Sequence, residues 1–242
     1  MLSAEEFATL RHARMRWNTP LSEEHAALLL QRLEVRSGVR VLDLGCGWGE
    51  LLLRAVAGGA GAAGVGVDTD EAALVRGRAL AASRSLGDRV RFVREEAAAW
   101  REPADRVLCV GAAHAFGGTV GALDALAGVV RPGGRLLFGD ACWEAAPGGA
   151  AVRIFGDAVL PLAELVEQVR VAGWRVLHLS TADLREWDDF ESTWRAGRQE
   201  WLLEHPEDSR AAEVRGELDV RLREYVGAYR GVLGMAYLVL GR

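Results

Sequence analysis

The stretch Val41-Leu42-Asp43-Leu44-Gly45-Cys46-Gly47-Trp48-Gly49 decides the fold. Its first half is mostly apolar and predicts a buried parallel strand over 39–44. Alternating glycines follow, and a helix is predicted over 50–57. A glycine loop lets the backbone turn sharply and approach a ligand closely, while the helix behind it offers free N–H groups. The spacing is G-x-G-x-G, because position 50 is glutamate, and so it differs from the G-x-G-x-x-G dinucleotide fingerprint.

Predicted strands and helices alternate on both sides of this loop. Further strands are expected over 63–68, 90–94, 105–111, 135–139, 175–179 and 235–240, and helices over 3–16, 22–34, 70–86, 121–130, 162–172, 187–204 and 209–229. Regular alternation of this kind predicts an α/β fold with a doubly wound, mainly parallel sheet. We expect one domain, 1–242, made of an N-terminal helical lid (1–37), a ligand-binding core (38–140) and a substrate-side half (141–242) with a helical insertion at 186–230.

Acidic residues follow two of these strands, at the sheet edge where ligands bind. Asp68 ends the strand Val65-Gly66-Val67-Asp68, 19 residues after Gly49. A carboxylate in this position can accept hydrogen bonds from ribose hydroxyls; capping of the next helix is the alternative, and one residue can do both. Glu95 or Glu96, after the third strand, could accept an adenine amine or could instead interact with a helix dipole.

Three segments together resemble class I S-adenosylmethionine-dependent methyltransferases: 43–49, Gly66-Val67-Asp68 and Arg131-Pro132-Gly133-Gly134-Arg135-Leu136. They occur in the family's order over roughly residues 38–140. The resemblance implies a Rossmann-like, seven-stranded sheet in the order 3-2-1-4-5-7-6, with the last strand antiparallel. The N-terminal helices and the tryptophan-bearing insertion also resemble a bacterial small-molecule type near the ubiquinone and menaquinone methyltransferases.

The same resemblance implies S-adenosylmethionine as the cofactor. By this resemblance, the backbone of Gly45, Cys46 and Gly47 is expected to cradle the methionine part of the cofactor. Asp43 is expected to help hold the amino end, and Asp68 to bind the ribose. Glu96 takes the adenine-amine position, where the family usually has aspartate. Four neighbouring positions are also expected at the cofactor: Thr69, Ala97, Gly111 and Ala112.

Composition excludes several other chemistries, because the 242-residue chain has 29 arginines and no lysine. Pyridoxal-phosphate and other Schiff-base enzymes need a lysine amine, as do P-loop enzymes, protein kinases and Tyr-x-x-x-Lys dehydrogenases. The net charge of −5 and the lack of a basic block disfavour a nucleic-acid partner. Neither a membrane span nor a signal-peptide core is visible, so we expect a cytoplasmic protein with no membrane partner.

Methyl transfer from a sulfonium needs alignment and exclusion of water, and a general base helps chiefly when the nucleophile is a hydroxyl. His114, just past the fourth strand, is the leading base candidate because imidazole titrates near neutral pH. Its alternative role is helix capping or packing beside Phe116. Asp140 and Glu144, after the fifth strand, could act as base or bind a substrate amine, or could simply solvate and cap a loop. No metal is expected, because acids and histidines do not cluster at ligand spacing.

Tryptophans recur at seven-residue intervals in the helix predicted over 187–204. Trp187, Trp194 and Trp201 therefore share one helix face, either as a core-facing stripe or as one wall of an aromatic substrate pocket. The pocket hypothesis draws on several parts of the chain: Trp17, Trp143, Trp194, Tyr225 and Arg230. Without lysine, Arg230 is also the candidate for binding a substrate anion.

The leading hypothesis is a methyltransferase that transfers a methyl group to an O, N, S or C atom of a small molecule, as a monomer or homodimer. Two alternatives stay open. One is a non-catalytic adenosylmethionine-binding protein. The other is a nucleotide-dependent oxidoreductase, which the G-x-G-x-G spacing and the Pro132-Gly133-Gly134 turn disfavour.

Overall fold

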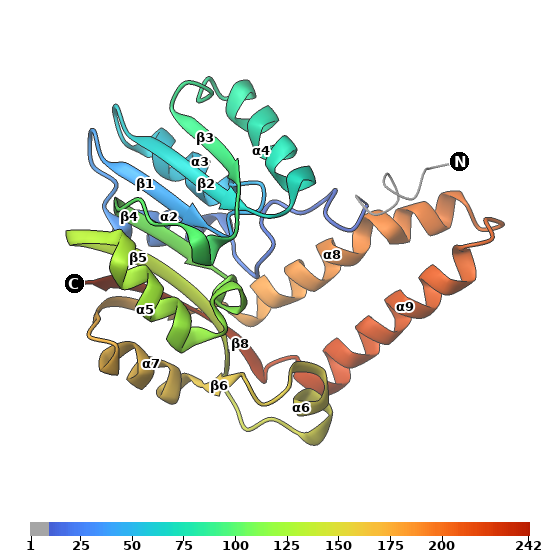
Figure 1. Ribbon diagram of the computed structural model, residues 1–242. Coiled ribbons are helices and arrows are strands. Elements are labelled where there is room, and N and C mark those ends of the chain that lie inside the picture. The colour runs from blue at the N-terminus through green and yellow to red at the C-terminus, as the bar shows by residue number, and fades with distance from the viewer. Residues whose placement is uncertain (1–9) are drawn as a thin grey trace.

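The computed structural model describes residues 10–242, which contain an eight-stranded sheet with helices on both faces (Figure 1). The strands are β1 (Arg40–Leu44), β2 (Ala63–Asp68), β3 (Val90–Arg94), β4 (Ala104–Val110), β5 (Val130–Trp143), β6 (Leu160–Pro161), β7 (Arg175–Thr181) and β8 (Leu233–Gly241). Their order is β3-β2-β1-β4-β5-β8-β7, and β8 is antiparallel to β5 and β7. The Rossmann-like order predicted from the sequence is confirmed. The additional strand is the two-residue β6, which pairs with the end of β5.

Helices flank both faces of the sheet, and two more form a hairpin beside it (Figure 1). They are α2 (Glu23–Leu33), α3 (Glu50–Gly58), α4 (Glu71–Ser83), α5 (Thr119–Val129), α6 (Gly149–Phe155), α7 (Leu162–Val171), α8 (Leu184–Glu204) and α9 (Ala211–Glu224). Val41 of β1 packs in the core that holds the apolar faces of α2, α3 and α4. Its neighbours Leu42 and Leu44 belong to the core on the side of α5 and α7. The mostly apolar run of β1 thus fills both layers, as expected for a buried parallel strand.

Side-chain caps set where several helices begin. Ser22 accepts a hydrogen bond from the His25 N–H at the start of α2, as the sequence predicts. Asp70 caps α4 by accepting from two N–H groups of its first turn. A capping box between Asp183 and Glu186 starts α8 three residues before the predicted Trp187.

Three predicted segments differ from the structure. Of the helix predicted over 3–16, residues 1–9 lie outside the described residues, and residues 10–14 form turns. The strand predicted over 135–139 extends to Trp143, because β8 pairs with it from Arg135 onward. The helix predicted to continue to Tyr229 ends at Glu224 and is followed by a π-helical turn.

The helices α8 and α9 form an antiparallel hairpin that projects away from the sheet (Figure 1). A small core of its own includes Trp201, Leu202 and Leu218. Residues 10–21, called here the N-terminal strap, pass alongside this hairpin. A Cβ atom at Gly197 of α8 would lie 2.4 Å from the carbonyl oxygen of Leu10, so the strap approaches α8 more closely than a side chain permits. None of the helices within residues 10–242 is long and apolar enough to cross a membrane.

This contact gives a test with a matched control. Gly197→Ala should lower the melting temperature, because the added methyl group collides with the Leu10 carbonyl. Gly216→Ala, in α9, meets no atom within 4 Å and should stabilise the protein by about 0.5–1 kcal/mol through helix propensity. Thermal unfolding of both variants measures the difference. Equal stabilisation by the two substitutions would contradict the close packing of the strap on α8.

Candidate functional site

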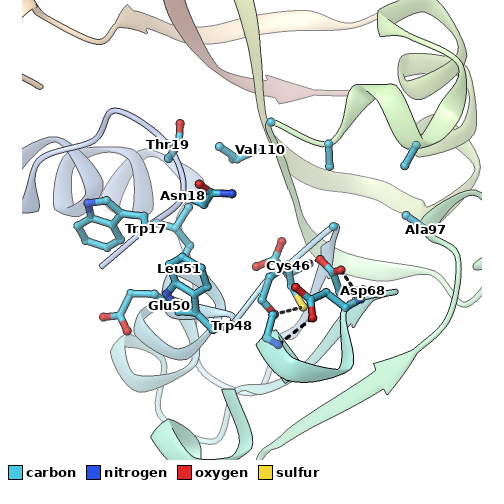
Figure 2. Close-up of a pocket in the computed structure, with 18 of the residues that line it drawn as sticks. Trp17, Asn18, Thr19, Cys46, Trp48, Glu50, Leu51, Asp68, Ala97 and Val110 are labelled. Atoms are coloured by element: carbon cyan, nitrogen blue, oxygen red, sulfur yellow. Dashed lines mark hydrogen bonds between the residues drawn. The ribbon is translucent and has the colours of Figure 1, made fainter. Parts of the chain in front are cut away.

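A cavity of about 280 Å³ lies at the carboxyl ends of β1, β2 and β4. This is the sheet edge where open α/β folds bind ligands, beside the reversal in strand order between β1 and β4. The glycine loop and the N-terminal strap contribute opposite parts of its wall (Figure 2). The cavity is lined by most of the residues that the sequence assigns to a cofactor: Asp43, Gly45, Cys46, Gly47, Asp68, Thr69, Ala97, Gly111 and Ala112.

Two glycines of the loop are required by close packing and by positive φ angles. A Cβ atom at Gly45 (φ 75°) would lie 2.3 Å from the Ala112 side chain, and one at Gly49 (φ 68°) would lie 2.5 Å from the Phe92 ring. Gly47 differs, because no atom lies within 4 Å of its Cβ position. Its backbone therefore borders open space. The helix α3 begins directly after the loop without a side-chain cap, so N–H groups of its first turn are available to a ligand.

Asp68 connects the loop to the end of β2. Its Oδ2 accepts a hydrogen bond from the Gly47 N–H at 2.7 Å, and its Oδ1 accepts from the Asp70 N–H at 2.9 Å (Figure 2). Helix capping, the alternative role for Asp68, falls to Asp70. A carboxylate oxygen can accept more than one hydrogen bond, so Asp68 keeps acceptor capacity on the side that faces the cavity.

Asp43 is a buried carboxyl group in the same cavity wall. It is 5% exposed, and burial together with the nearby charge of Asp68 raises its pKa to about 8. Within residues 10–242, no side chain or backbone N–H forms a hydrogen bond or ion pair with it. Ionising a buried acid without a partner costs free energy. The ligand group that suits Asp43 is therefore a cationic amine.

The strap is fastened over the glycine loop through its backbone. Arg76 of α4 donates to the carbonyl oxygens of His12 (2.8 Å) and Met15 (2.6 Å) and stacks over the Trp48 ring at 4.1 Å. Trp48 in turn donates its Nε1–H to the Arg16 carbonyl at 2.6 Å. The loop that borders the ligand therefore also holds the segment that covers it.

The strap brings Trp17, Asn18 and Thr19 to the cavity (Figure 2). The Thr19 hydroxyl lies 2.9 Å from the hydroxyl of Tyr237, which donates to the Pro20 carbonyl at 2.7 Å. Tyr237 is fully buried in β8, so the sheet itself positions Thr19. Sequence reasoning missed Asn18 and Thr19, because their one signal was that this stretch breaks a helical pattern.

Of the three candidates for acid–base chemistry, one lines the cavity and two do not. His114 lines the cavity from the 3-10 turn Ala113–Phe116. Asp140 lies outside the set of lining residues, where it accepts hydrogen bonds from the Thr119 hydroxyl (2.7 Å) and the Ala141 N–H (2.9 Å). Burial raises the pKa of Asp140, against the effect of these bonds. Glu144 is exposed and also outside. The sequence predicts both acids in a loop after the fifth strand. Because β5 extends to Trp143, Asp140 lies within the strand and Glu144 directly after it, away from the cavity.

Glu96 is not among the residues that line the cavity. It is exposed and precedes the 3-10 helix Ala97–Ala99 without forming a side-chain cap. Ala97 lines the cavity in its place. Glu96 thus directly precedes a residue of the cavity wall, and its assignment to an adenine amine stays a prediction.

Tyr225 and Arg230, expected to close a substrate wall, bind an aspartate instead. Arg230 forms two hydrogen bonds of 2.8 Å with Asp188, and the Tyr225 hydroxyl donates to the same carboxylate at 2.7 Å. These bonds lower the pKa of Asp188 to about 2. The guanidinium of Arg230 is thus neutralised within the chain, and the prediction that it meets a substrate anion is corrected.

Trp194 packs against a different core from Trp17 and Trp143, and of these three tryptophans Trp17 alone lines the cavity. Trp143 is buried and packs edge-on against Phe155. Trp194 stacks with Arg198 (4.5 Å) and Arg221 (3.7 Å) between α8 and α9. The core-facing stripe, which was the alternative for the seven-residue repeat, is the arrangement found.

Comparison with known proteins gives consistent matches. Residues 41–134 match a family model described as a methyltransferase domain. The chain is 32% identical over 240 residues to the uncharacterized protein YjhP of Escherichia coli strain K12, covering 96% of each chain. The X-ray structure of YjhP matches with a TM-score of 0.86, at 31% identity, covering 96% of this chain and 98% of YjhP.

Two further crystal structures are of S-adenosylmethionine-dependent methyltransferases in complex with S-adenosyl-L-homocysteine. The protein from Thiobacillus denitrificans is 30% identical with a TM-score of 0.87, and all of both chains is covered (100%). The protein from Geobacter sulfurreducens is 30% identical with a TM-score of 0.88, and 99% of each chain is covered.

The raised pKa of Asp43 predicts a pH-dependent effect of Asp43→Asn. In the folded chain Asp43 keeps its proton up to about pH 8, whereas in the unfolded chain it loses the proton near pH 3.8. The free energy of unfolding of the wild type therefore falls as pH rises between those two values. Asparagine removes the ionisation. Urea unfolding should therefore show a larger stabilisation by Asp43→Asn at pH 8 than at pH 5. A stabilisation that does not grow with pH would count against a raised pKa.

Proposed function

Because the chain belongs to the class I S-adenosylmethionine-dependent methyltransferases, we propose that it transfers the methyl group to an O, N, S or C atom of a small molecule by in-line displacement. The observation that favours a small acceptor is that the cavity proposed for the cofactor, about 280 Å³, lies beneath the fastened strap, so the acceptor has to reach the methyl group inside a covered site. Small-molecule sites are concave and enclosed in this way. The net charge of −5 gives no attraction for a phosphate backbone.

The residues of the cavity fit S-adenosylmethionine. The buried, unpartnered carboxyl of Asp43 suits the amino group, Gly45 and Gly47 allow close approach of the methionine part, and Asp68 keeps acceptor capacity for ribose hydroxyls. When bound, this cofactor supplies a methyl group already activated by its sulfonium. Nothing in this assignment needs a metal ion.

The chain contributes alignment and exclusion of water. Trp17, Asn18 and Thr19 close the cavity on the side of the strap, and Val110 and Gly111 border it at the end of β4. Holding two reactants in the reactive geometry can supply about 7–11 kcal/mol of a barrier, and excluding water removes a competing nucleophile. The hydrogen bonds that fasten the strap therefore serve the transfer step.

His114 is proposed as the general base for a hydroxyl acceptor. It lines the cavity and interacts electrostatically with the Asp140 carboxylate, which is held by Thr119. A ring nitrogen can take the acceptor's proton as the carbon–oxygen bond forms. Thiolate or neutral amine acceptors have no such need.

Asp68→Ala should abolish the thermal shift that S-adenosyl-L-homocysteine produces in the wild type. The substitution removes the ribose acceptor and also the partner of the Gly47 N–H, so the ligand-bound fold loses its preferential stabilisation. Asp88→Ala, at an exposed turn before β3, is the control and should keep the full shift. A shift by NADH in the absence of any by adenosylhomocysteine would contradict the proposed cofactor assignment.

His114→Ala should lower turnover of a hydroxyl acceptor by about 10²–10⁴-fold while adenosylhomocysteine affinity stays within about twofold, since the ring is assigned no cofactor contact. An acceptor is first identified by incubating the protein and methyl-labelled cofactor with a metabolite extract. Initial rates and calorimetric affinities of both proteins then separate the two effects. Unchanged turnover on a hydroxyl acceptor would leave His114 a structural role.

A further inference from the structure

A second cavity, of about 350 Å³, lies between the strap and the first half of α8. Residues three and four positions apart on α8 share one helix face, and that face lines the cavity. The strap supplies the opposite side. The lining includes Asp189, Phe190 and Thr193 from α8, and Trp17, Thr19 and Leu21 from the strap.

The two cavities share a wall. Trp17 and Thr19 line both, so these side chains separate the space beneath the strap from the space beside α8. The first cavity, at about 280 Å³, is at the lower end of ligand-pocket volumes, roughly 300–1,000 Å³. A nucleoside joined to an amino acid fills such a volume. The acceptor therefore needs neighbouring room, and the second cavity provides it.

The arginines around the second cavity are neutralised. Arg14 pairs with Glu200 at 2.7 Å. Arg16 pairs with Glu23, which also pairs with Arg54. Neither arginine is therefore a free cation for an anionic ligand.

One charge in this cavity lacks an opposite partner. Glu186 accepts hydrogen bonds from the Ser22 N–H (2.7 Å) and the Asp183 N–H (2.9 Å), and lies 3.0 Å from the His25 ring. Asp189, by contrast, has no hydrogen-bond or ion-pair partner among residues 10–242. The uncompensated charge of the second cavity is therefore negative and lies at Asp189.

We propose that the second cavity anchors the methyl acceptor through a cationic group, an ammonium or guanidinium on an apolar stem, with Asp189 as its counter-ion. Phe190 and Trp17 offer aromatic surface to the apolar stem. Because the Arg54 guanidinium already lies over the Trp17 ring at 4.7 Å, the ring that can also attract the ligand's cation is Phe190. The anchoring ammonium is not the nucleophile, because a protonated amine has no lone pair. The reactive atom lies at the other end of the acceptor and reaches the cofactor cavity past Thr19. This inference rests on the proposed function and names its substrate class.

Calorimetric titration of the adenosylhomocysteine-loaded protein tests the charge preference with three probes of similar size: 2-phenylethylamine, 2-phenylethanol and 3-phenylpropionate. The amine should bind most tightly. Asp189→Asn should weaken amine binding by about two- to fivefold, the range for an exposed ion pair, and leave the alcohol unaffected. The matched control is Asp219→Asn, an exposed aspartate of α9 away from both cavities, which should change nothing.

Equal affinity for the amine and the alcohol, tighter binding of the carboxylate, or an unchanged amine affinity in Asp189→Asn would each overturn the cationic anchor. The preceding titration with adenosylhomocysteine alone reports on the proposed function separately. Its failure would count against the cofactor assignment, whereas failure of the amine arm after normal cofactor binding would count against the second cavity alone.

Discussion

The hydrogen bond from the Gly47 N–H to the Asp68 carboxylate is the constraint on which the rest of the site depends. It joins the loop after β1 to the last residue of β2, and hydrogen bonds to a charged group contribute about 1.5–3 kcal/mol. The Gly45 and Cys46 N–H groups both donate to the Val67 carbonyl beside it. The glycine loop is therefore held by the neighbouring strand, and the register of β1 on β2 fixes the shape of the cavity.

That arrangement carries an electrostatic cost at Asp43. The carboxylate that anchors the loop also adds a negative charge near a buried acid, and burial with this charge keeps Asp43 protonated to about pH 8. A cationic amine in the cavity stabilises the ionised form, so ligand binding and proton release are coupled at neutral pH. The anchored loop also supplies Trp48, whose ring meets Arg76 and whose N–H holds the strap. The glycine loop and the N-terminal strap, which line the cavity from different sides, are thus joined in one network of contacts.

Local sequence predicts the parts of the site whose geometry is set by consecutive elements of the chain, here β1, the glycine loop, α3 and β2. Asp43, the glycines and Asp68 are of this kind, because backbone spacing places them at one sheet edge. Arg230 and Trp194 are not, because Arg230 pairs with Asp188 of α8 and Trp194 stacks with Arg221 of α9. Contacts between segments far apart in the sequence leave no periodic signal. Asn18 and Thr19 depend on the Tyr237 hydroxyl, more than two hundred residues away. The predicted placement of Asp140 and Glu144 differs from the structure for a third reason. Pairing with β8 extends β5 beyond Gly139, where the strand is predicted to end.

The contacts between α8 and α9 fix the orientation of α8 beside the second cavity. Glu191 is 1% exposed and accepts hydrogen bonds from Arg221 and from the Tyr229 hydroxyl, so the inner face of α8 is fixed against α9 and the π-helical turn. The opposite face, with Asp189 and Phe190, is then held toward the strap. A buried ion pair is a weak source of net stability, and we infer that the contacts of Glu191 act chiefly by orienting α8. The orientation of α8 matters because the two cavities share a wall made by Trp17 and Thr19. A rotation of α8 about its axis would turn Asp189 away from the second cavity.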